Sequence, residues 1–404
     1  MMRIAFISPW YSESMGYTEN LFPKAMSKLG VEVHLITSNA QINYYSPNYD
    51  QVYKPFLGPK LVDCGITKFD NYTIHRLPYY EPKKITRGPG IKGLYKYLSE
   101  LSPDIIQTFE IEPVTTFAGA EYASKKKCLF FTECHIHASV FRKTQKKQWK
   151  EVIKNWINFF DLELRLINNV TKLCYPIAED AAEIAISHYR VPERKIKVQS
   201  LGVDTDIFFP PQKNEHFVIR NKIRQEFGFS DSDIVCIYTG RFTKDKNPQC
   251  LAKAIQILNE DKFPFKGLFI GNGTEEDIRF IKSMEGCQVG SFVPSKDLPY
   301  YYWAADIGIW PREESTSQLD AMSCGLPLVL SNNIKVVERI QGNGLLYNEG
   351  DPIDLASTIK KMIDPDIRKN MSAIGVRKIN ESFSWEIIAR ERLNDYQLFL
   401  ENRQ

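Results

Sequence analysis

The sequence predicts an α/β protein of two Rossmann-like domains, each built on a doubly wound parallel sheet. Three observations lead to this prediction. The chain has 404 residues, which is too long for one ordinary hydrophobic core and comfortable for two. Short apolar runs alternate with longer amphipathic segments, which is typical of strands and helices in a parallel sheet. The alternation pauses at Pro210-Pro211 and then begins again, so two domains are expected to join near residues 205–212.

The first half opens on the apolar run RIAFISPW, residues 3–10, which is continuous as in strands covered on both faces. A helix is expected over residues 18–30, with Thr18 as its N-cap and Gly30 as its C-terminal stop. The later strands of this half are expected at residues 31–38, 73–80, 104–110, 129–137 and 172–179.

The second half repeats the same order. Its strands are expected at residues 233–242, 265–273, 287–293 and 306–311. Its helices are expected at residues 247–258, 277–285 and 297–305, before a short helix that Gly325 ends. A last helix over residues 384–404 has apolar residues at helical spacing. Spacing leaves open whether this helix closes the second domain or crosses back to the first.

Composition excludes several classes of protein. Lys and Arg total 52 against 49 Asp and Glu, and a net charge of +3 does not suggest nucleic-acid binding. The N-terminus lacks the pattern of a signal peptide, and no run approaches the ~20 apolar residues of a membrane span. The eight cysteines are scattered without a C-x-x-C pair, which favours reduced thiols. A cytoplasmic enzyme is therefore expected.

Candidate ligand residues follow the predicted strands, because ligands of open parallel sheets bind at the carboxyl ends of the strands. After the first strand, Gly16 would let the backbone approach a ligand near the start of a helix. His135 or His137 would supply a polar side chain after another strand. Arg241 and Lys246 follow a third, and two such cations suit a diphosphate.

Two further loops of the second half fit the same pattern. Gly271 and Gly273 would admit a flat ligand just before another helix. In the loop REESTSQLD, residues 312–320, three small residues open a short helix and would hold an anion or sugar hydroxyls. These residues are Ser315, Thr316 and Ser317. Asp320 lies one turn further, where its carboxylate would accept hydrogen bonds from a diol.

Several blocks of the chain, taken in order, resemble glycosyltransferase family 4, whose members are retaining, nucleotide-sugar-dependent enzymes with a GT-B fold. The blocks are SLGVDTDIFFP, GRFTKDKNP, GNGTEED, WAADIGIWP, LDAMSCGLPLV, GNGLLYNEGDPIDLASTI and FSWEIIARERLNDY. The resemblance implies an acceptor-side domain at residues 1–205 and a nucleotide-sugar domain at 206–383, facing a central cleft. It also implies that the helix at 384–404 packs back on the N-terminal domain.

The resemblance implies roles for the candidate residues. Arg241 and Lys246 would neutralise the donor diphosphate, and Gly16 would lie against it from the N-terminal domain. His135 would hydrogen-bond the donor sugar, with His137 as the alternative. The expected activity is hexosyl transfer with retention from a UDP- or GDP-type donor, and no cofactor or metal is expected.

The acidic loop departs from the family pattern. Eight positions before Asp320 the chain has Arg312, where the family has the first Glu of its E-x7-E motif. Glu314, which a small residue follows as in the family, is therefore expected to contact the donor sugar, and Glu313 is the alternative. Asp320 stands where the family has its second Glu and would bind the ribose hydroxyls. This loop therefore leaves the identity of the sugar open.

Two other functions remain alternatives. A metal-dependent transferase would use an Asp-x-Asp clamp, and such triplets occur at residues 204–206, 231–233 and 364–366. A non-catalytic nucleotide-sugar or carbohydrate-binding protein could share the same fold. A nicotinamide oxidoreductase is disfavoured, because no G-x-G-x-x-G follows a predicted strand.

Residues 142–160 combine lysines and an arginine with apolar residues at helical spacing. Such a helix could rest on an anionic membrane and meet a lipid-linked acceptor, or it could pack its apolar stripe inward. The acceptor is therefore expected to be a glycan, a lipid-linked molecule or a small molecule, with peripheral membrane contact as one alternative.

Overall fold

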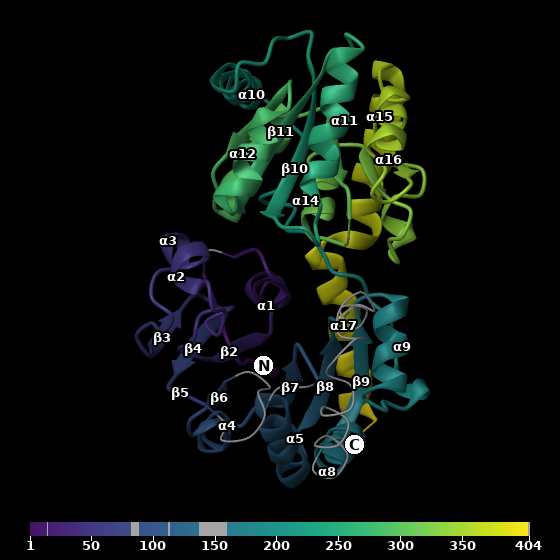
Figure 1. Cartoon of the computed structure of the whole chain (residues 1–404). Helices are drawn as coiled ribbons and strands as arrows, with labels where there is room; N and C mark the ends of the chain where they lie inside the picture. The colour runs from purple at the N-terminus through teal and green to yellow at the C-terminus, as the bar shows by residue number, and fades with distance from the viewer. Residues whose placement is uncertain (14, 82–88, 112–113, 137–159, 313, 403–404) are drawn as a thin grey trace. The chain divides into compact units, whose positions relative to one another are not determined.

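The computed structural model describes residues 1–13, 15–81, 89–111, 114–136, 160–312 and 314–402. Contacts within the chain divide it into two units (Figure 1). The N-terminal unit comprises Met1–Leu201 and Trp385–Gln404, and the C-terminal unit comprises Gly202–Ser384. Each unit has its own sheet, as the alternation of apolar and amphipathic segments predicts.

The sheet of the N-terminal unit has the strand order β3-β4-β2-β1-β7-β8-β9. Its strands are β1 (Arg3–Ser8), β2 (Glu32–Ser38), β3 (Gly65–Lys68), β4 (Tyr72–Leu77), β7 (Ile105–Thr108), β8 (Leu129–Cys134) and β9 (Thr171–Pro176). Neighbouring strands are parallel, except that β3 runs antiparallel to β4 at the edge. A separate antiparallel pair joins β5 (Tyr79–Tyr80) to β6 (Gly90–Ile91).

Helices cover both faces of this sheet. The helices are α1 (Thr18–Ser27), α2 (Tyr49–Val52), α3 (Lys54–Leu57), α4 (Leu94–Leu101), α5 (Val114–Lys126), α8 (Phe160–Val170), α9 (Glu179–Ser187) and α17 (Trp385–Glu401), with a 3-10 turn at Glu193–Lys195. One core cluster joins α4, α5, α8 and α9 to the sheet, and another joins α1 and α17 to the opposite face. Because both faces are covered, strands such as β1 are continuous apolar runs.

The C-terminal helix α17 therefore belongs to the N-terminal unit, which confirms the prediction that it crosses back. Its buried side includes Trp385, Ile388 and Tyr396. The ring of Tyr396 lies 4.7 Å from that of Phe131 in β8, and Trp385 lies 5.6 Å from Phe22 in α1. These ring contacts pack the apolar side of α17 against the N-terminal unit. The spacing of the apolar residues within the helix does not specify where it packs.

The C-terminal unit has a parallel sheet with the order β12-β11-β10-β13-β14-β15. Its strands are β10 (Ile234–Phe242), β11 (Phe265–Gly273), β12 (Cys287–Gly290), β13 (Ile307–Trp310), β14 (Leu328–Ser331) and β15 (Gly344–Tyr347). Its helices are α10 (Asn214–Glu226), α11 (Pro248–Glu260), α12 (Glu275–Ser283), α13 (Leu298–Ala304), α14 (Ser317–Ser323), α15 (Pro352–Lys360) and α16 (Pro365–Lys378). Single turns lie at Ser295–Asp297, Val337–Arg339 and Ile379–Phe383.

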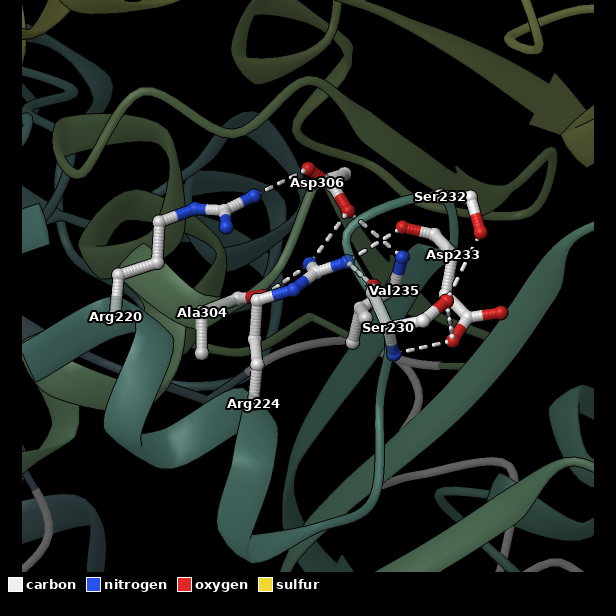
Figure 2. A network of polar contacts seen from close by, with 8 residues as sticks. All are labelled: Arg220, Arg224, Ser230, Ser232, Asp233, Val235, Ala304 and Asp306. Carbon is white, nitrogen blue, oxygen red and sulfur yellow. Dashed lines mark hydrogen bonds and ion pairs between the residues drawn. The ribbon is translucent and has the colours of Figure 1, made fainter.

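The buried side chain of Arg224 links α10 to the amino ends of strands in this sheet (Figure 2). Arg224 is 2% exposed and donates to the carbonyls of Ala304, Ser230 and Asp233 at 2.9, 2.7 and 2.6 Å. Its guanidinium also lies 3.2 Å from Asp306, whose carboxylate accepts from the backbone N–H of Val235 at 2.8 Å. Asp306 directly precedes β13, and Val235 is the second residue of β10. Arg224 therefore links α10 to the end of α13, to the turn before β10 and to the starts of two strands.

Several boundaries differ from the sequence expectation. Helix α1 has Tyr17 as its N-cap, so Thr18 is its first residue and not its cap. The strand expected at 73–80 ends at Leu77, and Tyr79 begins a separate pair. The edge strand β3 was not predicted, because its residues are all exposed and carry no pattern of burial.

Candidate functional site

The loop after β10 carries the two cations predicted to bind a diphosphate. Arg241 lies in the last residues of β10 with an exposed side chain. The chain then turns tightly, because the N–H groups of Lys246 and Asn247 both donate to the carbonyl of Thr243, at 3.0 and 2.8 Å. Asn247 adopts a left-handed φ of 50°, and Pro248 begins α11. The carboxyl end of β10 thus brings two positive charges to the start of a helix.

Lys246 links this loop to the loop after the neighbouring strand β13. Its Nζ donates to the carbonyl oxygen of Glu314 at 3.0 Å. One carboxylate oxygen of Glu314 accepts from the backbone N–H of Lys335 at 2.8 Å, after β14. Three adjacent strand ends are therefore connected through Glu314, whose side chain is partly exposed.

The small residues of the acidic loop are held by local contacts. The N–H of Ser317 lies 3.4 Å from the hydroxyl of Ser315, and the two hydroxyls are 3.3 Å apart. Behind them lies Arg339, which is 1% exposed and donates to the carbonyl of Ser315 at 3.4 Å. Among the described residues, none is a hydrogen-bond partner of the Nε of Arg339. Burial lowers the pKa of this guanidinium, and the charges of Glu338 and Glu314 oppose that shift.

Asp320 occupies a site that disfavours its ionised form. Burial, followed by the neighbouring charge of Asp204, raises the pKa of its carboxyl to about 8. A ligand hydroxyl that donated to this carboxyl would favour the ionised form again. The predicted contact with a diol is therefore chemically reasonable, because the hydroxyls of the ligand would donate hydrogen bonds to the carboxylate.

Gly271 and Gly273 have a structural role beside the one predicted for them. In the register of the sheet, Gly271 lies opposite Gly240 and Gly273 opposite Phe242. A Cβ on Gly271 would lie 1.9 Å from the carbonyl oxygen of Gly240, and one on Gly273 would lie 2.6 Å from the Cβ of Phe242. The close approach of β10 is enough to require glycine at both positions, and contact with a ligand stays a prediction.

In the N-terminal unit, Gly16 lies in the loop between β1 and α1, which several hydrogen bonds hold in place. The Met15 N–H donates to the carbonyl of Ser12 at 3.2 Å, and the Asn20 side-chain amide donates to the same carbonyl at 3.0 Å. The Ser12 hydroxyl donates to the side chain of Gln41 at 2.6 Å. The loop is thus fixed by groups from α1 and from the segment after β2, with Gly16 partly exposed.

His135 follows the last residue of β8 and is paired with a buried carboxylate. Its Nε2 lies 2.5 Å from Oε2 of Glu133. Burial lowers the pKa of His135, but the hydrogen bond and charge of Glu133 outweigh it, so the pKa is raised. The charged imidazolium donates from both nitrogens, and Nδ1 is the one that Glu133 does not engage.

A residue of the C-terminal helix holds Glu133 in place. Arg392 lies 2.6 Å from Oε1 of Glu133, and both side chains are 3% exposed. The Nε of Arg392 donates to Gln199 at 2.7 Å, and its guanidinium lies 3.7 Å from the ring centre of Tyr175. Gln107 in β7 donates to the same Oε1 of Glu133. Despite its burial, the pKa of Glu133 is lowered by the charge of Arg392 and by His135.

A second buried carboxyl lies near this pair. Glu19, in the first turn of α1, is 9% exposed. Burial raises the pKa of its carboxyl to about 7, while the charges of His135 and Glu133 act on it in opposite directions. Acidic and basic groups from α1, β8 and α17 therefore gather behind His135.

The sequence does not single out Glu133, Arg392, Glu19 or Arg339 as site residues. A signal exists for Glu133, because a carboxylate within the apolar run LFFTEC must find a partner when the strand is buried. Arg392 gives no such signal, because its partner is 259 residues away and depends on where α17 docks.

Some predicted residues lie outside the described part of the chain. These are His137, Glu313 and residues 142–159. Among the described residues, no group of three His, Cys, Asp or Glu side chains is arranged to hold a metal ion. Of the Asp-x-Asp triplets, Asp233 accepts from the N–H of Ser230 at 2.6 Å and Asp364 caps α16. The described helices include none that is long and apolar enough to cross a membrane.

Comparison with known proteins identifies the family. Residues 23–207 match the model described as Glycosyltransferase Family 4, and residues 233–365 match the model described as Glycosyl transferases group 1. The O-antigen chain mannosyltransferase B of Escherichia coli is 25% identical over 257 residues, which cover 61% of this chain and 65% of that protein. A D-inositol 3-phosphate glycosyltransferase of Xylanimonas cellulosilytica is 25% identical over 231 residues, covering 54% of each. The chain thus spans less than two thirds of the relatives it matches.

Solved structures share the fold over nearly the whole chain. Sucrose-phosphate synthase from Thermosynechococcus elongatus superimposes with a TM-score of 0.71 at 16% identity, over 100% of both chains. Anabaena Alr3699/HepE, in complex with UDP and glucose, gives a TM-score of 0.67 at 14% identity, over 98% of this chain and 100% of that one. The two Rossmann-like units are therefore those of the GT-B fold, and this chain belongs to the group 1, family 4 glycosyltransferases.

Proposed function

We propose that this chain is a retaining glycosyltransferase that moves a sugar from a UDP- or GDP-type nucleotide sugar to a hydroxyl of a glycan, lipid-linked or small-molecule acceptor. The observation that carries the proposal is the placement of Arg241 and Lys246 at the carboxyl end of β10, beside the start of α11. The contact of Lys246 with Glu314, 3.0 Å away, joins this loop to the predicted sugar-contacting loop.

The chemistry asked of these residues follows from charge. When the bond between the sugar and the diphosphate breaks, the leaving diphosphate takes the electron pair and gains negative charge. Arg241 offers a planar fork of donors and Lys246 a point charge to stabilise it. Asp320 would accept from the ribose hydroxyls, and Glu314 would contact the donor sugar.

The N-terminal unit would contribute a hydrogen-bond donor to the donor sugar. The contact with Glu133 favours the imidazolium form of His135, so its second ring nitrogen would donate to a hydroxyl of the donor sugar. The names of the relatives support the donor class, since one is a mannosyltransferase and one neighbouring structure is a complex with UDP-glucose.

The first experiment is thermal stability measured against UDP, GDP and their sugar conjugates, with and without EDTA. A stabilising shift for one nucleoside diphosphate, unchanged by EDTA, is expected. A shift that EDTA abolishes would instead favour the metal-dependent transferase. A shift without any sugar transfer to a panel of acceptors would favour a non-catalytic nucleotide-sugar-binding protein.

The substitution Lys246→Ala tests the role of the cation directly. Removing a preorganised positive charge from the leaving group is expected to lower kcat by roughly 10²–10³-fold, with the melting temperature nearly unchanged. Lys244→Ala is the matched control, because Lys244 lies in the same loop with an exposed side chain. Equal losses in the two variants would contradict the assignment to Lys246.

A further inference from the structure

Four aromatic side chains lie at the carboxyl ends of the strands of the N-terminal sheet, where Gly16 and His135 also lie. Trp10 follows β1, Tyr44 and Tyr45 follow β2, and Tyr79 follows β4. These strands are neighbours in the order β4-β2-β1, so the loops after them adjoin. The ring centres of Trp10 and Tyr45 are 6.4 Å apart, those of Tyr44 and Tyr45 are 5.6 Å apart, and those of Tyr44 and Tyr79 are 6.0 Å apart. These four residues form the aromatic cluster discussed below.

The aromatic cluster is exposed to solvent although its backbone is fixed. Tyr45 is 64% exposed, and the other three side chains are partly exposed. The N–H of Tyr44 donates to the carbonyl of Gln41 at 3.2 Å, and Gln41 in turn donates to the carbonyl of Leu57 at 2.7 Å. The N–H of Tyr79 donates to the side chain of Asn39 at 2.9 Å. These bonds fix the backbone that carries the rings of Tyr44 and Tyr79, which lowers the entropic cost of ordering this part of the surface on binding.

We propose that the aromatic cluster is the acceptor subsite and that it stacks the ring of a neutral sugar. The C–H groups on one face of a pyranose carry partial positive charge and pack against the negative face of an aromatic ring. Sugar hydroxyls at the edge of the ring need polar partners, and Glu81, which accepts from the Tyr44 hydroxyl at 3.1 Å, supplies one. The proposal rests on the transferase function proposed above, whose acceptor class it names.

The charges of the described residues near the cluster favour a neutral sugar over a phosphorylated acceptor. Glu13 and Glu81 are exposed near the cluster, and both would repel a phosphate. The nearby Arg76 is already engaged, since it donates to the carbonyl of Tyr11 at 3.1 Å, lies 3.5 Å from Glu13 and stacks on the Tyr11 ring. Lys60 lies over the ring of Tyr49. The hydroxyl and indole groups of the cluster also suit a hydroxyl-rich ligand better than an acyl chain.

The position of the cluster suits an acceptor. Trp10 and Gly16 belong to the same loop after β1, and Gly16 is the residue predicted to lie against the donor diphosphate. A sugar stacked on Trp10 and Tyr45 would therefore lie at the strand ends that carry the donor-side loop of this unit.

Saturation-transfer NMR on the full chain, with UDP or GDP present, tests the proposal. The probes are neutral methyl hexopyranosides and their disaccharides, myo-inositol phosphate, and vesicles of anionic lipid. Saturation of the aromatic protons is expected to reach the C–H protons of at least one neutral sugar. Tyr45→Ala should weaken that sugar's binding roughly tenfold. The matched control is Phe69→Ala, because Phe69 is 56% exposed in the same unit but outside the cluster.

The proposal is overturned if no neutral sugar receives saturation, if only the phosphate or the vesicles bind, or if Tyr45→Ala and Phe69→Ala bind the sugar alike. Nucleotide binding, followed by thermal shift, separates this result from the transferase proposal. Nucleotide binding without a stacked sugar would reject the aromatic cluster and leave the transferase standing. A sugar that binds to a chain insensitive to every nucleotide would reject the transferase and leave the cluster as a carbohydrate site.

Discussion

Each unit contains a buried arginine paired with a carboxylate, but the two pairs lie at opposite ends of their strands. Arg224 in the C-terminal unit holds Asp306 and three carbonyls at the amino ends of β10 and β13 (Figure 2). Arg392 in the N-terminal unit holds Glu133 near the carboxyl end of β8. Ligands of such sheets bind at the carboxyl ends, so the same kind of contact has different consequences in the two places.

The two pairs differ in the other groups that each carboxylate contacts. Asp306 accepts from a backbone N–H and a second arginine, Arg220, so its contacts end within the scaffold. Glu133 contacts His135, a predicted site residue, and its charge stabilises the imidazolium form of that side chain. A buried ion pair is by itself weak support for stability or for function. The role of the Arg392 pair therefore depends on its place in the sheet.

The largest effect is expected from Arg392→Leu, which removes the arginine partner of the buried carboxylate of Glu133 and leaves it only His135 and Gln107. The free energy of unfolding of the N-terminal unit should fall by about 3–5 kcal/mol. Native-state hydrogen exchange followed by mass spectrometry reports each unit separately and should show the loss in β7, β8 and β9. Arg390→Leu on the same helix is the control, because Arg390 is largely exposed and its contact with Glu386 should contribute less than about 1 kcal/mol.

The matched change in the other unit is Arg224→Leu, which leaves three carbonyls and Asp306 without this donor. A loss of about 2–4 kcal/mol is expected in the C-terminal unit, somewhat smaller because Asp306 is 20% exposed and keeps other partners. Nucleotide affinity of the remaining folded protein should stay within about twofold of the wild type. A large loss of affinity without a loss of exchange protection would remove the distinction between the two arginines.

Glu133→Gln sharpens the comparison, because it keeps the shape of the side chain and removes its charge. The pKa of His135 should then fall, since the hydrogen bond and charge of Glu133 are what raise it. A histidine whose folded pKa is raised adds stability below its unfolded pKa of about 6.5, and this is lost as pH rises through the folded pKa. NMR titration of the His135 ring protons measures the shift. An unchanged titration would mean that Arg392 and Glu133 are structural only.

A smaller effect is expected from a second polar chain of the N-terminal unit. His34 and His75 lie 2.8 Å apart through their ring nitrogens, and Tyr97 and Glu32 complete the chain at its ends. Burial lowers both pKa values, that of His75 to about 4. The two neutral histidines therefore contribute to the free energy of unfolding of the N-terminal unit above pH 6.5, and this contribution is lost as pH falls toward 4.

The N-terminal unit should therefore lose on the order of 2 kcal/mol between pH 7 and pH 4.5 through this pair. His75→Gln should remove most of that dependence, while Glu19, whose pKa is raised, opposes it equally in both proteins. Hydrogen exchange at the two pH values measures the difference, with the C-terminal unit as an internal reference. An identical acid response of the wild type and His75→Gln would show that the pair does not titrate as described.

Particular residues show which features of the fold and the candidate site can be predicted from the sequence. The apolar runs of β1, β8, β10 and β13 fix both sheets, because strands covered on two faces must be continuous in hydrophobicity. The edge strand β3 escaped prediction because none of its residues is buried, so no periodicity marks it. The positions of Arg241 and Lys246 followed from the strand-end rule, while the contact of Lys246 with Glu314 required two loops to be placed side by side.

By itself the sequence determined the fold class, the family, and the cations expected to bind a diphosphate, since these depend on local periodicity and on residues close together in the chain. Only the tertiary structure decided that Glu133 lies between His135 and Arg392. It also decided that the aromatic cluster of Trp10, Tyr44, Tyr45 and Tyr79 forms at the carboxyl ends of neighbouring strands. Such contacts join residues tens to hundreds of positions apart. Their partners are selected by which strands become neighbours and where a terminal helix docks, and no local pattern encodes either choice.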